Sequence, residues 1–163
     1  MAKSKRMSRG KDNDGLSAFN NVKNQLGYCG LWCGSCSVGN GTANVQAGRC
    51  MKTLTDYGVK EWGPKGVDYD ALLHGLELLS SMEPCKGCLK GGGNSECPAR
   101  ACAIEKGVSE CYECKSKKTC KNAHYIDHMR KGARRVGMKV KDEAGDPKKV
   151  MAGWIRESGR GKS

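Results

Sequence analysis

Cysteine is the residue type that most constrains what this chain can fold into, because eleven of its 163 residues are cysteine. Cys50 stands apart, and ten others form two clusters along the chain. The clustered cysteines are Cys29, Cys33, Cys36, Cys85, Cys88, Cys97, Cys102, Cys111, Cys114 and Cys120. Thiols at this density either form disulfides or bind metal, and the fold depends on which of the two applies.

Three features of the sequence favour metal over disulfides. The chain begins with a basic, polar segment and has no apolar stretch that resembles an export signal, so we expect it to remain in the reducing cytoplasm. The number of cysteines is odd, which does not suit a closed disulfide framework. The pairs Cys85 with Cys88 and Cys111 with Cys114 have the two-residue gap that directs both thiolates toward one metal centre. We expect the isolated Cys50 to pack as a small apolar residue instead.

The apolar residues are too few for an ordinary core. Only 37% of the residues are hydrophobic, the cysteines account for a large share of them, and Phe19 is the single phenylalanine. A chain of this length is expected to form one small domain, and bound metal can supply the stability that a thin core lacks. No run of residues approaches the length of a membrane span.

The net charge of +12 is concentrated at the two ends of the chain. Residues 1–14 hold five basic and two acidic side chains, and residues 130–163 hold eleven basic and four acidic ones. We therefore divide the chain into a basic flexible tail (1–14), a cysteine-rich metal-binding domain (15–129) and a basic C-terminal extension (130–163). Basic ends favour docking to an anionic partner, which is either an acidic protein surface or nucleic acid.

Apolar periodicity predicts several helices and no strand. The clearest helix runs from 68 to 82, where Leu72, Leu73, Leu76, Leu79 and Met82 form an apolar stripe that we interpret as core packing. Further helices are expected over 16–26, 45–57, 98–106 and 122–131, and a weak one over 150–156 within an otherwise irregular basic end. The predicted fold is mainly α, with irregular loops that metal organises.

The spacing of the cysteines leaves their grouping into sites open. Cys29, Cys33 and Cys36 have the spacing that radical S-adenosylmethionine enzymes use, but the chain is too short and too poor in strands for the barrel of those enzymes. A second set is Cys85, Cys88, Cys97 and Cys102, in which Pro98 follows Cys97 as in ferredoxin-type clusters. A third set is Cys111, Cys114 and Cys120, with His124 as a possible fourth ligand of a zinc ion. The sets can also exchange members.

Catalytic motifs are weak in this sequence. His124 and His128 lie one helical turn apart, which is more typical of a solvated helix face than of a metalloenzyme. The pair Cys85 and Cys88 lacks the strand and helix context of a thioredoxin-like dithiol, and no nucleophile elbow, phosphate loop or dinucleotide motif is present. We therefore predict no catalytic residues and favour a non-enzymatic role.

The order of motifs resembles that of a small prokaryotic cysteine-rich family, the domain-of-unknown-function family 3795. The resemblance rests on Tyr28-Cys29-Gly30-Leu31-Trp32-Cys33-Gly34-Ser35-Cys36, Pro84-Cys85-Lys86-Gly87-Cys88, Cys97, Cys102-Ala103-Ile104-Glu105-Lys106-Gly107, Cys111-Tyr112-Glu113-Cys114 and Cys120. It covers residues 28 to about 125 and leaves both basic ends outside. It implies metal binding through the cysteines and no defined activity. Ser37 stands where the family commonly has proline.

Two hypotheses follow from the sequence. In the first, the ten clustered cysteines hold one or two iron–sulfur clusters, [4Fe-4S] by preference, in a redox- or oxygen-responsive accessory protein that docks on a larger enzyme or complex. In the second, they hold structural zinc in an adaptor whose basic tails bind RNA or ribosomes. We favour iron–sulfur because the candidate ligands are almost wholly sulfur.

Overall fold

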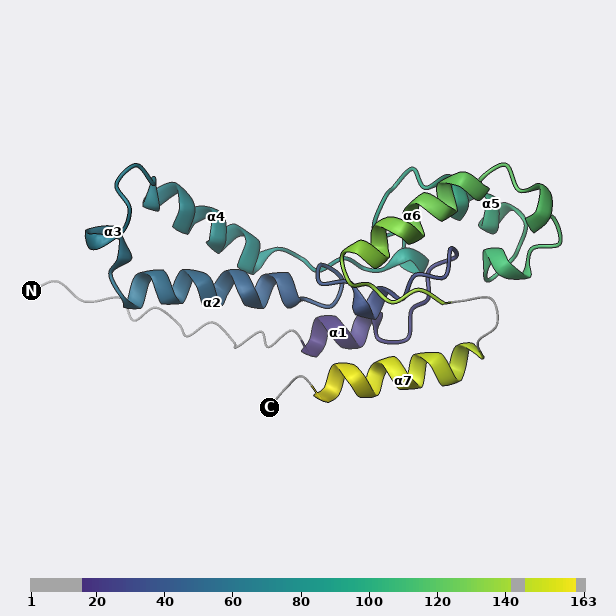
Figure 1. The fold of residues 1–163 in the computed structure, drawn as a ribbon, viewed down its shortest axis with the longest axis horizontal. Helices are drawn as coiled ribbons and strands as arrows, with labels where there is room; N and C mark the ends of the chain where they lie inside the picture. Colours follow the sequence, from purple (N-terminus) through teal and green to yellow (C-terminus); the bar gives the residue numbers. More distant parts are fainter. Residues whose placement is uncertain (1–15, 142–145, 161–163) are drawn as a thin grey trace, which may run out of the picture.

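The computed structural model describes residues 16–141 and 146–160 and divides them into a helical arm and a cysteine-bearing lobe (Figure 1). The expected 1–14 tail lies outside the described residues. Helices dominate the described part of the chain and no named strand occurs in it, which confirms the mainly helical fold with cysteines in loops. Within those residues, no helix is long and apolar enough to cross a membrane.

The arm is a helical hairpin that projects away from the lobe. It consists of α2 (Thr42–Asp56), the short α3 (Val59–Trp62) and α4 (Tyr69–Ser81), and α2 packs along α4. Asp68 caps α4, since its carboxylate accepts a hydrogen bond from the Ala71 N–H at 3.0 Å. At the base of the arm the buried Asn44 donates its side-chain amide to the Leu79 carbonyl at 3.1 Å. Because Asn44 belongs to α2, this bond fastens the end of α4 to the first turn of α2.

The lobe contains four single turns of 3-10 helix and two α-helices. The turns are η1 (Cys33–Ser35), η2 (Cys88–Lys90), η3 (Cys111–Glu113) and η4 (Lys117–Thr119), and the helices are α5 (Pro98–Glu105) and α6 (Ala123–Arg135). Pro98 occupies the first turn of α5, where its missing N–H costs nothing. The predicted boundary between residues 129 and 130 falls inside α6, which runs to Arg135.

The helix expected over 16–26 is shorter in the structure: α1 spans Leu16–Val22. The chain then turns, and Leu26 pairs with Trp32 in an isolated antiparallel bridge. Gly27 and Gly30 close this turn, because the Gly27 N–H donates to Leu31 O at 2.8 Å and the Gly30 N–H donates to Gly27 O at 2.8 Å. The turn ends the helix early and brings Cys29 into the lobe.

Trp32 is the centre of the small core, with only 1% of its surface exposed. Phe19 of α1 meets it edge-on at 6.3 Å between ring centroids, and Trp154 of α7 (Pro147–Arg160) stacks on it at 5.3 Å. The helix expected over 150–156 is confirmed, but it is longer than expected, because α7 is fourteen residues long. Its packing on Trp32 places this helix beside α1 (Figure 1).

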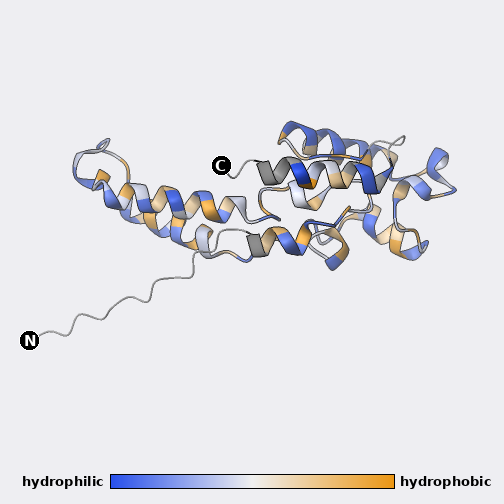
Figure 2. Ribbon diagram, turned by 90° about the horizontal axis from the view of Figure 1, so that it is seen from below, coloured by the Kyte–Doolittle hydropathy of each residue, from blue (hydrophilic) through white to orange (hydrophobic). Residues whose placement is uncertain are grey.

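The apolar stripe predicted as core packing in α4 is only partly buried. Leu73 and Leu76 are half-buried where α4 packs along α2, whereas Leu72 and Leu79 are exposed. Apolar residues are accordingly spread over the surface of the arm (Figure 2). The prediction failed for the outer part of the stripe because a two-helix hairpin has no third layer to cover it.

Candidate metal centre

Two facing turns bring four of the cysteines together. Cys33 begins η1 and Cys36 follows its last residue, while Cys85 precedes η2 and Cys88 begins it. The Cys88 N–H points at the sulfur of Cys33, with 3.5 Å between nitrogen and Sγ. The two CxxC turns are 49 residues apart in sequence at their closest, and the fold brings their four thiols together into one cluster.

Gln25 and the glycines of the loop hold this arrangement in place. The buried Gln25 side chain donates to Lys86 O at 2.9 Å and accepts from the Leu89 N–H at 3.3 Å, so it grips the loop on both sides. Gly87 has a φ of +84°, and a Cβ there would lie 2.2 Å from Gln25 Oε1. A Cβ on Gly92 would lie 2.6 Å from the sulfur of Cys85. These contacts leave no room for a side chain at either glycine.

The first cavity, of about 370 Å³, opens beside these turns. The cysteines that line it are Cys29, Cys33, Cys36, Cys85, Cys88 and Cys97. Burial raises the pKa of the Cys33 thiol, and the neighbouring Cys88, Cys85 and Cys36 raise it further. Thiols that share one desolvated space cannot all ionise unless a cation joins them.

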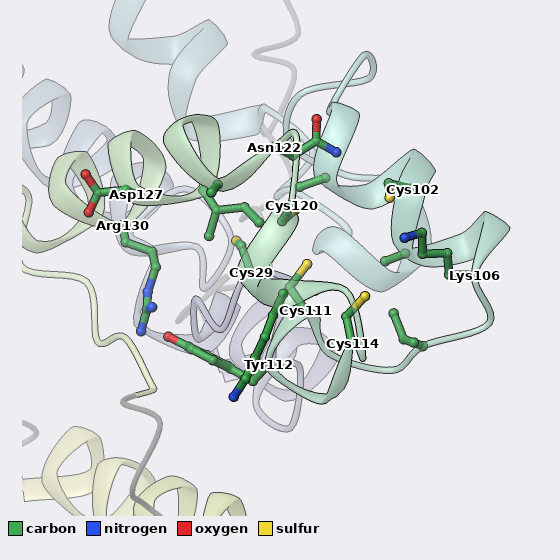
Figure 3. Close-up of a pocket in the computed structure, with 16 residues that line it drawn as sticks. Cys29, Cys102, Lys106, Cys111, Tyr112, Cys114, Cys120, Asn122, Asp127 and Arg130 are labelled. Atoms are coloured by element: carbon green, nitrogen blue, oxygen red, sulfur yellow. The ribbon is translucent and has the colours of Figure 1, made fainter.

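The second cavity, of about 200 Å³, lies between α5, η3 and the start of α6 (Figure 3). The cysteines that line it are Cys29, Cys102, Cys111, Cys114 and Cys120. Figure 3 shows these side chains arriving from separate elements around a common space. Burial raises the pKa of the Cys111 thiol to about 11, and Cys120, Cys102 and Cys114 add to that shift.

Cys29 lies between the two cavities and lines both. Burial raises the pKa of its thiol to about 12, against the lowering effect of a hydrogen bond from the Leu31 backbone. The thiols that raise it further are Cys88 and Cys97 on one side and Cys111 on the other. The two cavities are thus neighbours within a single sulfur-lined region.

The structure groups the cysteines differently from their order in the sequence. Cys85 and Cys88 join Cys33 and Cys36, while Cys102 joins Cys111, Cys114 and Cys120. The expected set of Cys85, Cys88, Cys97 and Cys102 is therefore divided between the two cavities. His124 is exposed and lines neither cavity, whereas His128 lines the first.

All ten clustered cysteines line one cavity or the other, and Cys50 lines neither. Cys50 is exposed on α2, so the expectation that it is buried as an apolar residue was wrong. All eleven thiols are free. Within residues 16–141 and 146–160, no three side chains of His, Cys, Asp or Glu converge closely enough to hold a single metal ion. The thiols surround two spaces instead of meeting at a point.

A buried ion pair lies next to the second cavity and stabilises its lining. Lys141 pairs with Glu110, and both side chains are almost fully enclosed. Tyr112 donates its hydroxyl hydrogen to the Lys141 carbonyl at 2.9 Å, and the Arg130 guanidinium lies 4.6 Å from the Tyr112 ring centroid. Residues 130–141 thereby fix the η3 turn that carries Cys111 and Cys114. Sequence reasoning missed this support, because nothing local links Lys141 to Glu110.

A group of exposed lysines lies on, or next in sequence to, the elements that line the second cavity, and we call it the lysine rim. Its members are Lys106, Lys115, Lys117, Lys118 and Lys121. Lys106 and Lys117 line the cavity itself. Sequence analysis placed the positive charge at the chain ends and overlooked this group, although the run from Cys114 to Lys121 contains four lysines and no acidic residue.

Comparison with known proteins places these motifs in a family. The sequence model described as "Protein of unknown function (DUF3795)" matches residues 25–125, which include all ten clustered cysteines. No curated protein and no solved structure matches the chain.

Proposed function

The chain belongs to the DUF3795 family, and we propose that this member is a non-catalytic iron–sulfur protein that responds to redox state or oxygen and docks on a larger enzyme or complex. The observation that carries the proposal is the gathering of ten thiols around two adjoining cavities. Cysteine thiolates are the usual ligands of iron–sulfur clusters, and four of them hold each [4Fe-4S] unit.

The chemistry of the donors fits such clusters. The first cavity offers the facing turns of Cys33, Cys36, Cys85 and Cys88, and the second offers Cys102, Cys111, Cys114 and Cys120. Cys29 and Cys97 remain as further thiols beside these sets. The raised thiol pKa values show that the thiolate form is unfavourable in these cavities without a cation, and the iron of a bound cluster would stabilise it.

The spacing of the thiols favours a polynuclear centre over one zinc ion. Zinc binds thiolate at about 2.3 Å, so a tetrahedral zinc site draws its four sulfurs to within about 3.8 Å of one another. Within the described residues no three His, Cys, Asp or Glu side chains converge closely enough to hold one metal ion, and the thiols are instead spread around two cavities. A cluster with its own iron and sulfide would fill more of this space.

Redox sensitivity would follow because the cluster-binding thiols hold the short turns of the lobe in place. The η1, η2 and η3 turns that carry them are single turns with little apolar burial of their own. Loss or oxidation of a cluster would release these turns and change the surface they form. A reducing compartment such as the cytoplasm suits free thiols of this kind.

Docking is supported by the lysine rim at the mouth of the second cavity. Five lysines beside the proposed cluster would steer an acidic protein surface toward it. The alternative function is a structural zinc adaptor that binds RNA, for which the same lysines would contact phosphates. Near the lysine rim, Tyr112 already contacts Arg130 and Lys141, and the strongly exposed aromatic residues Tyr57 and Trp62 lie on the arm, away from the rim, so the rim offers little for base stacking and favours a protein partner.

Anaerobic purification decides between the two functions. The proposal predicts broad absorption at the violet end of the visible spectrum, with about eight iron atoms per chain if both sites hold four-iron clusters. A colourless protein with stoichiometric zinc would establish the adaptor instead. Partner capture before and after nuclease treatment separates a protein partner from RNA, because an association that nuclease abolishes contradicts protein docking.

A further inference from the structure

Helix α4 has apolar side chains on two sides, and only one of them has a partner. Leu73 and Leu76 are half-buried where the helix packs along α2. The exposed fractions on the other side are 39% for Leu72, 57% for Leu78, 51% for Leu79 and 37% for Met82. A helix that is apolar on two sides is expected to have neighbours on both.

Part of this side follows the spacing of a helix–helix contact. Leu72, Gly75 and Leu79 of α4 are separated by three and four residues, which is the spacing of the a and d positions of a heptad, and Met82 follows three residues later at the end of the helix. We call these four residues the outer stripe. A Cβ built on Gly75 meets no atom within 4 Å, so the centre of the outer stripe is open. Within the helix the stripe is flanked by Ala71, Leu76 and Leu78, which carry no charge.

The hairpin gains little burial on its own. No side chain of α4 is fully buried, and in α2 only Asn44 and Ala47, near the base of the arm, are. Two helices of this length bury too little apolar surface to be stable by themselves. A further layer of helices on the outer stripe would supply the missing contact.

The undescribed segments of this chain do not suit the outer stripe. Residues 1–15 contain only Met1, Ala2 and Met7 as apolar side chains, and residues 142–145 and 161–163 contain only Ala144. None of these segments supplies an apolar partner for the stripe, which favours another molecule as the occupant. A second copy offers an uncharged stripe of the same spacing, and two such hairpins form a four-helix bundle with two-fold symmetry.

Charge also favours a second copy. Residues 42–82 hold five acidic and four basic side chains, so the arm has a net charge of −1 in a chain of +12. The arm and the basic lobe lie at opposite ends of the molecule (Figure 1). Contact between two arms therefore joins the nearly neutral ends and keeps the two basic lobes apart.

We propose that the outer stripe of α4 is a self-association surface through which two copies of the chain pair arm to arm. The surface contains none of the clustered cysteines, so pairing does not depend on which metal the lobe holds. The dimer would present two lysine rims at opposite ends.

The oligomeric state tests this directly. Light scattering coupled to size exclusion, from about 1 to about 100 µM chain, covers the range in which a small interface dissociates. Reductant is needed throughout, because the exposed Cys50 lies on the same arm. The expected result is a dimer for the full chain and at least a tenfold rise in the dimer dissociation constant for Leu72→Gln with Leu79→Gln. The matched control is Leu89→Gln with Ile104→Gln, which alters two exposed apolar residues of the lobe that line neither cavity and should leave the dimer unchanged.

A second variant separates loss of pairing from loss of fold. Gly75→Gln places a good helix former at an open position, so it should raise the helical content of the arm or leave it unchanged. It also puts a side chain in the middle of the interface and should weaken the dimer. A chain that is monomeric at every concentration overturns the proposal and leaves the stripe to a different protein. A dimer that survives both sets of stripe substitutions also overturns it.

Discussion

The arm and the lobe of this protein show two ways of ordering a chain with few apolar residues. The arm consists of regular helices, of which α4 is capped by Asp68, and its surface charges pair, as Lys60 does with Asp70 at 2.8 Å. The lobe consists of single turns placed by cysteines, glycines and one buried glutamine. The arm draws its order from the packing of α2 along α4 and from the proposed pairing with a second copy, whereas the lobe relies on contacts among single turns that lie far apart in sequence. The lobe is therefore the region whose order should depend on metal.

Metal removal is the largest expected effect, and it should separate the two regions. Stripping the metal with a chelator under reducing conditions should unfold the loops of the lobe, because structural metal sites contribute on the order of 10 kcal/mol of folding free energy. Amide hydrogen exchange should show lost protection over residues 85–120 and retained protection over α2 and α4. Equal loss of protection in both regions would contradict the division.

Truncation of Trp32 should be the most damaging apolar substitution. Trp32→Ala removes the ring that Phe19 and Trp154 contact and should cost about 3 to 5 kcal/mol, the usual range for a fully buried aromatic residue. Chemical denaturation of the metal-loaded protein measures this loss. Trp62→Ala, which truncates a tryptophan exposed at the tip of the arm, is the matched control and should cost under about 1 kcal/mol. Equal losses for the two variants would show that Trp32 is not the centre of the core.

Metal affinity should increase with pH. Burial raises the pKa of Cys29 to about 12 and that of Cys111 to about 11, so these thiols are protonated at neutral pH in the absence of metal. A thiol that becomes a ligand must release its proton. At a pH below the thiol pKa, the metal affinity therefore rises about tenfold per pH unit for each proton released. The chelator concentration that removes half of the metal should therefore rise from pH 7 to pH 8. An unchanged value would show that no protonated thiol is a ligand.

The smallest expected effect belongs to the base of the arm. Asn44→Ala removes the side-chain hydrogen bond to Leu79 O and should lower the stability of the arm by about 1 to 2 kcal/mol. Hydrogen exchange in α4 reports this change, and the metal content should stay the same. A loss of metal in this variant would show that arm and lobe are not independent.

Sequence reasoning recovered the helices better than their packing. The apolar period predicted the helix at 68–82, which the structure has as α4. The same period did not reveal which leucines are buried, because the hairpin partner of α4 lies earlier in the chain. Spacing alone selected the ten clustered cysteines that line the two cavities. Spacing did not predict how they group, because the grouping depends on a contact between Cys33 and Cys88, which are far apart in sequence.

The most direct test of the account is the metal content of two paired variants purified anaerobically. Cys33→Ser with Cys88→Ser alters only the first cavity, and Cys111→Ser with Cys114→Ser alters only the second. If each cavity holds its own cluster, as proposed, each variant keeps about half of the iron and sulfide of the full protein. Full iron and sulfide in both variants, or a folded parent protein with no metal at all, would contradict it.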